Sequence, residues 1–299
     1  MYVSFSGGKD STVLKHIVDS MYSDVPALFV DTGLEFPEIR QFVKSVKNGD
    51  YPCFNSNINI VRPKIRFDEV IKTYGYPIIS KEVAKKIHEG RSAIKNGNQN
   101  NYASRQFDGT YISKNGKTNT SSMKKWKYVY ESDMPVSHMC CNVMKKNPAK
   151  IYEKENQRVP FVGNMASESR LRYNEWLAYG CNAFDASRPT SNPLSFWTDQ
   201  DVLEYLIKYN VPYCSIYGDI VENDGKFKTT KYQRTGCLFC GFGCHLEKEP
   251  NRFQKLKETH PRQYDYCING GEYINGIWTP NKYGLGMRKP LEFIGVNVD

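Results

Sequence analysis

The amino-terminal stretch constrains the fold most, because a buried strand, a glycine turn and an amphipathic helix follow one another directly. Tyr2 to Phe5 is a short apolar run, the turn Ser6-Gly7-Gly8-Lys9-Asp10 follows it, and apolar residues then recur at helical spacing from Val13 to Met21. A second, fully apolar run lies at Ala27 to Val30. Two strands joined by a helix predict a parallel sheet that is covered on both faces.

The alternation of helix and strand continues along the chain. We expect helices near residues 37–46, at 149–156, from about residue 167 and after Thr198, a natural N-cap, with strands at 59–61 and 159–162. Between about Lys95 and Ser122 the apolar periodicity gives way to Asn, Gly, Ser, Thr and Lys, which indicates a long surface insertion outside the core. The expected organisation is a parallel-sheet α/β domain over residues 1–212, with a polar insertion at 95–128, and a small cysteine-rich region over 213–299.

The charge balance favours an anionic partner or substrate. The 299 residues include 41 lysines and arginines against 32 aspartates and glutamates, a formal net charge of +9. A generally solvated basic surface explains this balance equally well. The longest apolar runs, such as Val25 to Val30, are far shorter than a membrane span, and the sequence opens on a motif rather than a leader. We therefore expect a cytoplasmic protein with no membrane partner.

The turn from Ser6 to Ser11 has the properties of a phosphate-binding loop. It follows a buried strand and opens a helix, where free backbone N–H groups and the helix dipole attract an anion. Its two glycines let a phosphate approach the backbone closely. No glycine lies upstream at the Walker spacing, so an ordinary P-loop is excluded.

The complete hexapeptide in this context resembles the signature loop of the PP-loop ATP pyrophosphatases, in the adenine nucleotide alpha-hydrolase-like superfamily, whose domains are Rossmann-like. Two further segments are similar to the phosphoadenosine phosphosulfate (PAPS) reductase family. One is Asp31-Thr32-Gly33-Leu34-Glu35-Phe36-Pro37-Glu38, at the end of the second strand. The other is Asn192-Pro193-Leu194 with Trp197-Thr198 and Asp201-Val202. The matching segments lie between Tyr2 and about Cys240.

This resemblance implies that an adenine nucleotide, either ATP or an adenylyl sulfate, lies across the carboxyl ends of the strands, as ligands do in open parallel sheets. The residues expected to hold its phosphates are Ser6, Gly7, Gly8, Lys9, Asp10 and Ser11. Those expected beside the adenosine are Asp31, Thr32, Gly33 and Glu35. A third nucleotide-facing segment contributes Gly163, Glu168, Ser169 and Arg170.

Nine cysteines, an odd number with adjacent and Cys-x-x-Cys spacing, suit metal ligation better than a disulfide framework. Cys-x-x-Cys places two thiolates on one turn, and a second pair elsewhere can complete four ligands. The layout resembles that of assimilatory adenylyl-sulfate reductases, which hold a four-iron, four-sulfur cluster. The resemblance implies Cys140, Cys141, Cys237 and Cys240 as ligands, with a structural zinc site as the alternative. We expect the remaining cysteines outside this motif to be small buried or surface residues: Cys53, Cys181, Cys214 and Cys267.

Two departures from the reductases of this family bear on the reaction. Those enzymes carry their cysteine nucleophile in a carboxyl-terminal tail, whereas Leu291 to Val296 contains no cysteine and none follows Cys267. Relatives also commonly carry an arginine where Met165 stands, so Arg170 or Arg172 is expected to supply that anion contact. Both departures favour a second chemistry of the superfamily, in which ATP is cleaved to an adenylate and pyrophosphate.

The favoured function is therefore ATP-dependent sulfur transfer to a nucleic acid or nucleotide. Lys9, Asp10 and Cys244 are the catalytic candidates; Lys9 and Mg²⁺ would neutralise the departing pyrophosphate. Cys244, which precedes His245, is either a persulfide carrier or a structural residue. A sulfur donor protein is a further possible partner. The alternatives are a PAPS or adenylyl-sulfate reductase with an unusual nucleophile such as Cys244, and a non-catalytic regulatory or defence module that binds nucleotides.

The insertion alternates cations with aromatic residues, the combination that binds phosphates and stacks on unpaired bases. Lysine-rich and asparagine-rich loops also occur without nucleic acid, so contact with tRNA or another nucleic acid and a plain solvated loop are equally open. The cations are Lys95, Arg105, Lys114, Lys117, Lys124, Lys125 and Lys127. The aromatic residues are Tyr102, Phe107, Tyr111, Trp126 and Tyr128.

Overall fold

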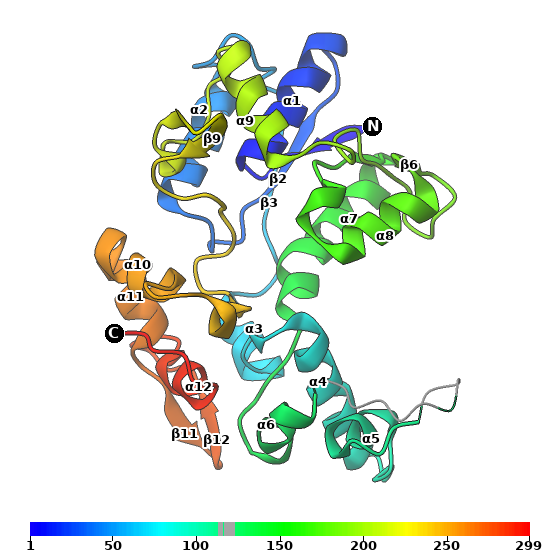
Figure 1. The fold of residues 1–299 in the computed structure, drawn as a ribbon, viewed down its shortest axis with the longest axis vertical. Coiled ribbons are helices and arrows are strands. Elements are labelled where there is room, and N and C mark those ends of the chain that lie inside the picture. Colours follow the sequence, from blue (N-terminus) through cyan, green and yellow to red (C-terminus); the bar gives the residue numbers. More distant parts are fainter. Residues whose placement is uncertain (113–115, 117–122) are drawn as a thin grey trace. The chain divides into compact units, whose positions relative to one another are not determined.

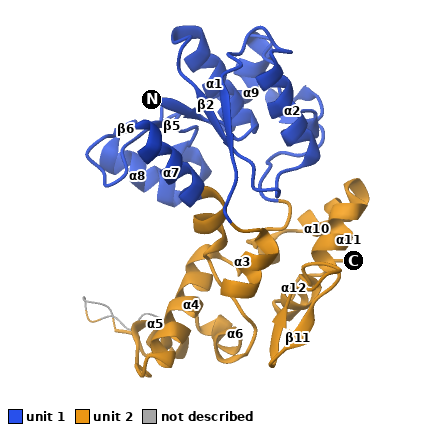
Figure 2. Cartoon of the chain, turned by 180° about the vertical axis from the view of Figure 1, so that it is seen from behind, with its two compact units in different colours: residues 1–64, 146–237 blue, residues 65–145, 238–299 orange. Residues whose placement is uncertain are grey.

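The structure, a computed structural model, describes residues 1–112, 116 and 123–299. The chain forms two compact units that are interleaved along the sequence (Figure 2). Unit 1 contains residues 1–64 and 146–237, and unit 2 contains residues 65–145 and 238–299. The chain thus passes between the units three times, whereas the expected domains are consecutive. The expected boundary near residue 212, taken as a boundary between independently folding domains, stays a prediction.

Unit 1 is built on a six-stranded sheet with the order β3-β2-β1-β5-β7-β6 (Figure 1). Its strands are β1 (Tyr2–Ser4), β2 (Ala27–Val30), β3 (Ile58–Val61), β5 (Pro160–Phe161), β6 (Asn182–Ala183) and β7 (Thr190–Ser191). All neighbouring pairs are parallel except β6 and β7 at one edge. This arrangement confirms the predicted α/β fold with a mainly parallel central sheet.

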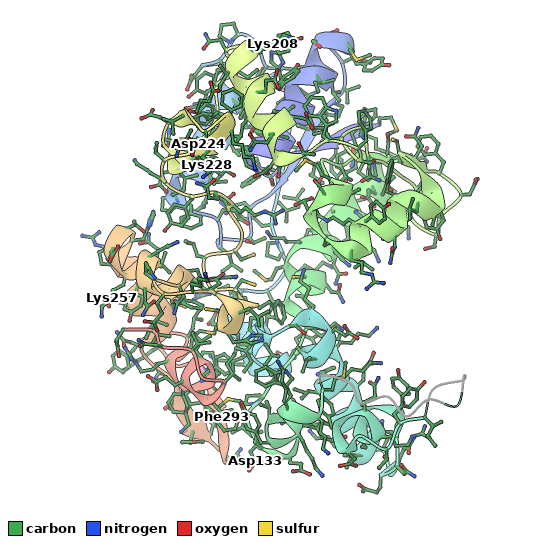
Figure 3. The ribbon with its side chains drawn as sticks, in the orientation of Figure 1. Asp133, Lys208, Asp224, Lys228, Lys257 and Phe293 are labelled. Atoms are coloured by element: carbon green, nitrogen blue, oxygen red, sulfur yellow. The ribbon has the colours of Figure 1, made fainter. Side chains whose placement is uncertain are left out.

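The helices of unit 1 begin where the sequence predicts them, within a few residues. They are α1 (Lys9–Met21), α2 (Pro37–Asn48), α7 (Asn147–Asn156), α8 (Arg170–Tyr179) and α9 (Asp199–Lys208). Thr198 caps α9 as expected, because its side chain accepts the N–H of Asp201 while the Asp201 carboxylate accepts from Thr198. A hairpin of β8 (Ile220–Asn223) and β9 (Lys226–Thr229) follows, and Figure 3 labels its residues Asp224 and Lys228.

Unit 2 is mostly helical. Its elements are α3 (Phe67–Tyr74), β4 (Ile78–Ile79), α4 (Lys81–Lys95), α5 (Tyr102–Asp108), η1 (Lys124–Trp126), α6 (Lys127–Glu131), β10 (Gly241–Phe242), α10 (Arg252–Thr259), α11 (Pro261–Ile268), β11 (Glu272–Ile274), β12 (Ile277–Thr279) and α12 (Arg288–Phe293). β10 pairs in parallel with β4, so the segment after Cys240 is fixed beside the start of α4. In the described residues, no helix is long and apolar enough to cross a membrane.

The expectation that the insertion lies outside the core is wrong for its described part. α5 lies within it and α6 begins at its end, and the buried Phe107 ring of α5 stacks on the Tyr130 ring of α6 with centroids 4.5 Å apart. α4 packs closely on both helices, because a Cβ atom on Gly90 would lie 2.8 Å from Ala103 and 2.9 Å from Tyr130. Few apolar residues carry this packing, so the polar composition of the segment concealed it. Lys114 and Lys117 lie outside the described residues.

Candidate functional site

Gly7 shapes the loop at the start of α1. Its backbone has φ +74°, a conformation that residues with a side chain rarely adopt. A Cβ atom there would also lie 2.9 Å from the Cγ2 atoms of Ile39 and Val43 on α2. The loop is therefore pressed onto α2 at a position that only glycine fits.

The two serines of the loop brace it internally. The Ser11 hydroxyl accepts the N–H of Ser6 at 3.1 Å and donates to the Gly8 carbonyl at 2.9 Å. The two hydroxyl oxygens lie 3.0 Å apart, and the Ser6 hydroxyl accepts the N–H of Gly8 at 3.3 Å. These bonds hold the loop in shape at the point where the helix begins, which is the geometry that an anion-binding turn needs.

Lys9 is held in the interior by two carboxylates. Its side chain is nearly buried, and Nζ donates to Asp10 Oδ1 at 3.1 Å and to Asp199 Oδ1 at 2.6 Å. Asp199 is the first residue of α9, so its carboxylate reaches Lys9 from a different part of unit 1. An incoming phosphate would meet a fixed ammonium group whose present partners are both anions.

Tyr217 supports the same turn from outside it. Its hydroxyl accepts the backbone N–H of Lys9 at 3.2 Å and lies 2.7 Å from the Thr235 hydroxyl. Burial raises the pKa of Tyr217 to about 12, so the phenol is neutral at physiological pH. Sequence reasoning missed Asp199, Tyr217 and Thr235, because their link to the loop is long-range and no local pattern marks it.

The second predicted segment lies at the end of β2. Asp31 is nearly buried, and it pairs with Arg40 and Arg62, whose Nε atoms each lie 3.1 Å from a carboxylate oxygen. Thr32 donates its N–H and its hydroxyl to the Glu35 carboxylate at 3.0 and 2.7 Å. The strands β1 and β2 are parallel neighbours, so their carboxyl ends lie on the same side of the sheet. This turn and the phosphate loop both follow these carboxyl ends.

The third predicted segment adjoins the phosphate loop directly at Gly163. A Cβ atom on Gly163 would lie 3.3 Å from the Asp10 carbonyl oxygen and 3.5 Å from the Ser11 nitrogen. The structure therefore brings the first and third predicted segments into contact. Met165, two residues further on, is buried.

Two arginines form ion pairs with Glu168 of this third segment. Its carboxylate accepts the N–H of Met165 at 3.0 Å and pairs with both Arg172 and Arg234. Burial, reinforced by the neighbouring charge of Arg234, lowers the pKa of Arg172, while the Asp10 carboxylate acts in the opposite direction. Of the two arginines proposed to replace the one missing at Met165, Arg172 is within electrostatic reach of the loop, whereas Arg170 is exposed. Ser169 caps α8 through the N–H of Arg172.

The predicted thiol site lies largely within unit 2. The Sγ atoms of Cys140 and Cys141 are 3.9 Å apart, and the hydrogen bond from Cys140, together with the charges of Lys81 and Lys145, holds the pKa of Cys141 below its usual range. Burial raises the pKa of Cys240, and the charge of Cys141 acts in the same direction. Cys141 is therefore within electrostatic reach of both Cys140 and Cys240.

Cys237 and Cys244 have different surroundings. Cys237 is the last residue of unit 1 and adjoins Leu238 of unit 2. Cys244 is buried, and burial together with the charge of Glu247 raises its pKa to about 12. Across the described ranges, no group of three or more His, Cys, Asp or Glu side chains is arranged to hold a metal ion.

The remaining cysteines are dispersed, and all nine cysteines are free thiols. Cys214 and Cys267 are buried, Cys181 is half-buried, and Cys53 is exposed.

The aromatic residues of the insertion that are predicted to stack on bases differ in their exposure to solvent. Phe107 and Trp126 are buried, and Trp126 packs edge-on against His245 with ring centroids 5.0 Å apart, whereas Tyr102 and Tyr128 are exposed.

Comparison with known proteins finds similarity over most of the chain. The sequence model of the phosphoadenosine phosphosulfate reductase domain matches residues 1–104 and 100–241. Two uncharacterized proteins of Methanocaldococcus jannaschii are each 23% identical, over 89% and 92% of this chain and 40% and 50% of their own lengths. The chain thus spans half or less of the length of these relatives. The crystal structure of phosphoadenylyl-sulfate (PAPS) reductase from Candida auris, in its phosphate complex, aligns with a TM-score of 0.40 and 17% identity, over 75% of this chain and 82% of that one.

The match to the domain model extends over most of the chain, from the phosphate loop through the third nucleotide-facing segment to Cys240. The predicted family is confirmed on this ground. Its members are enzymes of the sulfonucleotide-reductase type that bind adenine nucleotides, within the PP-loop superfamily. The chain belongs to the phosphoadenosine phosphosulfate reductase family.

Proposed function

We propose that this protein is an ATP-dependent, adenylating sulfur transferase that carries an iron–sulfur cluster and acts on a nucleic acid or nucleotide. The observation that carries the proposal is the adjacent pair Cys140 and Cys141, with Cys240 within electrostatic reach of Cys141, in a chain whose other unit holds the braced phosphate loop. Nucleotide activation and sulfur handling are the two functions that such a transferase needs.

The phosphate loop supports the activation step. Attack of the acceptor oxygen on the α-phosphorus of ATP forms an adenylate and releases pyrophosphate, on which negative charge develops. The positive end of the α1 helix dipole and the Lys9 ammonium would stabilise that charge, and Mg²⁺ would share the task. Hydrosulfide then displaces AMP, so that a carbon–sulfur bond replaces the carbon–oxygen bond and one proton is released.

The chemistry of the expected ligands, all of them thiols, supports the proposal of a metal cluster. Cys140, Cys141 and Cys240 provide sulfur alone, and the lowered pKa of Cys141 favours the thiolate that metals require. Cys237, from the same Cys-x-x-Cys turn as Cys240, would complete the set. When bound, such a cluster would supply iron to which sulfide can attach. Zinc would fit an all-thiolate site as well, so the metal is a matter for measurement.

A sulfonucleotide reductase is the second candidate, because the family includes such enzymes. That reaction needs a thiolate to attack sulfate sulfur. Cys244 is a poor nucleophile as it stands, because it is buried and its pKa is raised to about 12. This observation favours the transferase over a reductase that uses Cys244.

The experiment that tests the proposal measures the products formed from the nucleotide. Anaerobically purified protein should convert ATP to AMP and pyrophosphate in the presence of the acceptor, and Lys9→Ala should abolish most of that turnover. Lys208→Ala, at the far end of α9, is the matched lysine control. Release of sulfite from an adenylyl sulfate would instead identify a reductase, and nucleotide binding with neither product would identify a non-catalytic module. Mass spectrometry of nucleosides from cells with and without the gene would identify the acceptor.

A further inference from the structure

Residues 232–235 of unit 1 are linked to all three of the segments that are expected to face the nucleotide. We call these residues the strap, and they follow β9 as an irregular segment (Figure 1). The links to the second, third and first segments are those of Tyr232 with the Phe36 ring, Arg234 with the Glu168 carboxylate, and Thr235 with Tyr217, whose hydroxyl accepts from Lys9. One short stretch of chain therefore connects the parts of the expected nucleotide site.

The link to the phosphate loop lies where a phosphate would bind. The Tyr217 hydroxyl accepts the N–H of Lys9, the first residue of α1, at 3.2 Å and lies 2.7 Å from the Thr235 hydroxyl. A Cβ atom on Gly8 would lie 3.4 Å from the Tyr217 hydroxyl and 3.7 Å from that of Thr235. Both hydroxyls therefore line the space beside the Gly8 backbone, where a glycine allows a phosphate to come close.

Tyr217 and a phosphate would compete for the backbone donor of Lys9. A backbone amide carries one hydrogen, and that of Lys9 points at the Tyr217 oxygen. Hydrogen bonds to a charged phosphate oxygen are shorter and stronger than those to a neutral hydroxyl. A phosphate in the loop is therefore expected to take this N–H from Tyr217, as it would compete with Asp199 for the ammonium group of the same lysine.

The contacts of the strap allow it to loosen at one end only. At its start, Tyr232 lies edge-on to Phe36 with ring centroids 4.9 Å apart, and Gln233 Nε2 donates to the Thr229 carbonyl at 2.5 Å. At its end Thr235 is followed by Gly236, where a Cβ atom would meet nothing within 4 Å. Loss of the contact between Tyr217 and Thr235 would therefore loosen the chain from Thr235 onwards, while the start of the strap stays attached.

We propose that the strap is a latch on the phosphate loop, which nucleotide binding releases. When a phosphate oxygen takes the Lys9 N–H, the Tyr217 hydroxyl is displaced, and Thr235 loses its hold on the loop in the same step. The strap ends two residues before Cys237, so occupation of the loop would reach this predicted metal ligand along the chain itself. The latch rests on the nucleotide binding that the proposed function includes, but not on sulfur transfer.

The test measures hydrogen exchange of the anaerobically purified full chain by mass spectrometry, with and without α,β-methylene ATP. This analogue cannot be cleaved between its α and β phosphates, so the result does not depend on turnover. Peptides that cover residues 6–11 should exchange more slowly with the analogue, whereas those that cover residues 233–237 should exchange about fivefold faster, as expected when one hydrogen bond is lost. A strap that is unchanged or protected, or a loop that the analogue does not protect, would overturn the latch.

Two variants separate the hydroxyl that competes with phosphate from the one that holds the strap. Tyr217→Phe keeps the buried ring and removes the competing oxygen, so the strap should exchange rapidly without the analogue, and calorimetry should show about fivefold tighter binding of the analogue. Thr235→Val should also free the strap, but it leaves Tyr217 on Lys9 and should bind the analogue as the wild type does. Weaker binding in Tyr217→Phe would show that the hydroxyl holds the phosphate, contrary to the latch.

Tyr205→Phe is the matched control. It removes another tyrosine hydroxyl that contacts α1, 3.0 Å from Nδ1 of His16 and away from the loop. Both the exchange of its strap and its affinity for the analogue should match the wild type, and the same changes as in Tyr217→Phe would overturn the latch. A wild-type protein that shows the opposed changes at loop and strap, but forms no AMP from ATP, would retain the latch and lose the proposed transferase.

Discussion

The ammonium group of Lys9 lies 2.6 Å from the carboxylate of Asp199, so the first residue of α1 is tied to the first residue of α9. Lys9 is 3% exposed, whereas the Asp199 side chain is 47% exposed. The lysine therefore cannot move far, but the carboxylate can turn towards solvent. A phosphate that reaches Lys9 would compete with Asp199 for the same donor.

Substitution of Asp199 by Asn should therefore strengthen nucleotide binding. The amide keeps the size of the side chain but removes the negative charge that competes with phosphate, and we expect about fivefold tighter binding, or about 1 kcal/mol. Isothermal titration calorimetry with ATP measures the effect. Asp201→Asn is the control, since Asp201 caps α9 without touching Lys9. Weaker binding in Asp199→Asn would show that Asp199 positions Lys9 rather than competing for it.

A comparison of Gly7 with Gly33 distinguishes the cost of backbone strain from the cost of close packing. Gly7 and Gly33 have nearly the same φ, +74° and +76°, but a Cβ atom would clash with Ile39 and Val43 at Gly7 and meet open space at Gly33. Gly33→Ala should lower the free energy of unfolding by about 1 kcal/mol through strain alone. Gly7→Ala should cost about 2 kcal/mol more, because the loop must move away from α2. Urea denaturation measures both, and equal costs would contradict the packing seen at Gly7.

Sequence patterns predicted the helices of unit 1 and four of its strands, β1, β2, β3 and β5, because each of these is a local pattern. The buried strand Ala27 to Val30 and the capping box at Thr198 need only neighbouring residues to form. The contacts of Lys9 with Asp199 and Tyr217 join residues about two hundred positions apart, and no local rule pairs them. Phe107 was assigned to a surface loop because single apolar residues in a polar segment carry no periodicity, although they suffice to pack α5.

The sequence also gave no sign of the interleaved units. β4 and β10 have two residues each and are separated by more than half the chain, too little apolar sequence for either to stand out. The thiol pattern is visible in the sequence because cysteines are rare and their spacing is specific; that Cys140, Cys141, Cys237 and Cys240 bind a metal together stays a prediction.

The buried ion pair of Lys15 and Asp19 makes the stability of α1 depend on both partners. Nζ lies 2.7 Å from Oδ2, both side chains are buried, and the same oxygen accepts the N–H of Asn55 at 2.8 Å. Lys15→Met should lower the free energy of unfolding by about 3–5 kcal/mol, because it leaves a buried carboxylate unpaired. Adding Asp19→Asn should recover much of this loss, since the amide oxygen still accepts from Asn55 without a charge. Equal stability of the single and double variants would contradict this account.

The stability of the Lys15→Met variant should depend on pH, in a direction that follows from the pKa of Asp19. Burial raises the pKa of Asp19 above its ordinary value, and Lys15 opposes that rise, so Lys15→Met leaves the pKa higher still. A carboxyl group with a raised folded-state pKa binds its proton more tightly in the folded state. The stability deficit of Lys15→Met relative to wild type should therefore shrink as pH falls through that pKa and grow as pH rises. Thermal melts of both proteins between mildly acidic and neutral pH measure the difference, and a deficit that grows on acidification would refute it.

Metal content separates the predicted ligands from the other cysteines. Anaerobically purified protein should be brown and contain about four irons per chain, as an all-cysteine cubane cluster requires. Cys140→Ser and Cys240→Ser should each lose most of the iron and the visible absorbance. Cys53→Ser and Cys181→Ser are matched controls, because these thiols lie outside the grouped set, and they should keep both. Stoichiometric zinc without iron would replace the cluster with a structural zinc site.

Cys244 gives the sharpest form of this test, because it lies near the grouped thiols but outside the predicted ligand set. Arg252 is within electrostatic reach of both Cys244 and Cys240 and donates to the Cys240 carbonyl at 3.0 Å, so the two residues share one neighbouring cation. If Cys140, Cys141, Cys237 and Cys240 are the ligands, Cys244→Ser should retain iron and its visible spectrum, whereas Cys237→Ser should lose them. The reverse result would move the fourth ligand into unit 2 and exclude Cys244 as a free sulfur carrier. Circular dichroism and thermal melting of both variants, compared with Cys267→Ser as a buried-cysteine control, would show whether a loss of iron reflects ligation or a loss of fold.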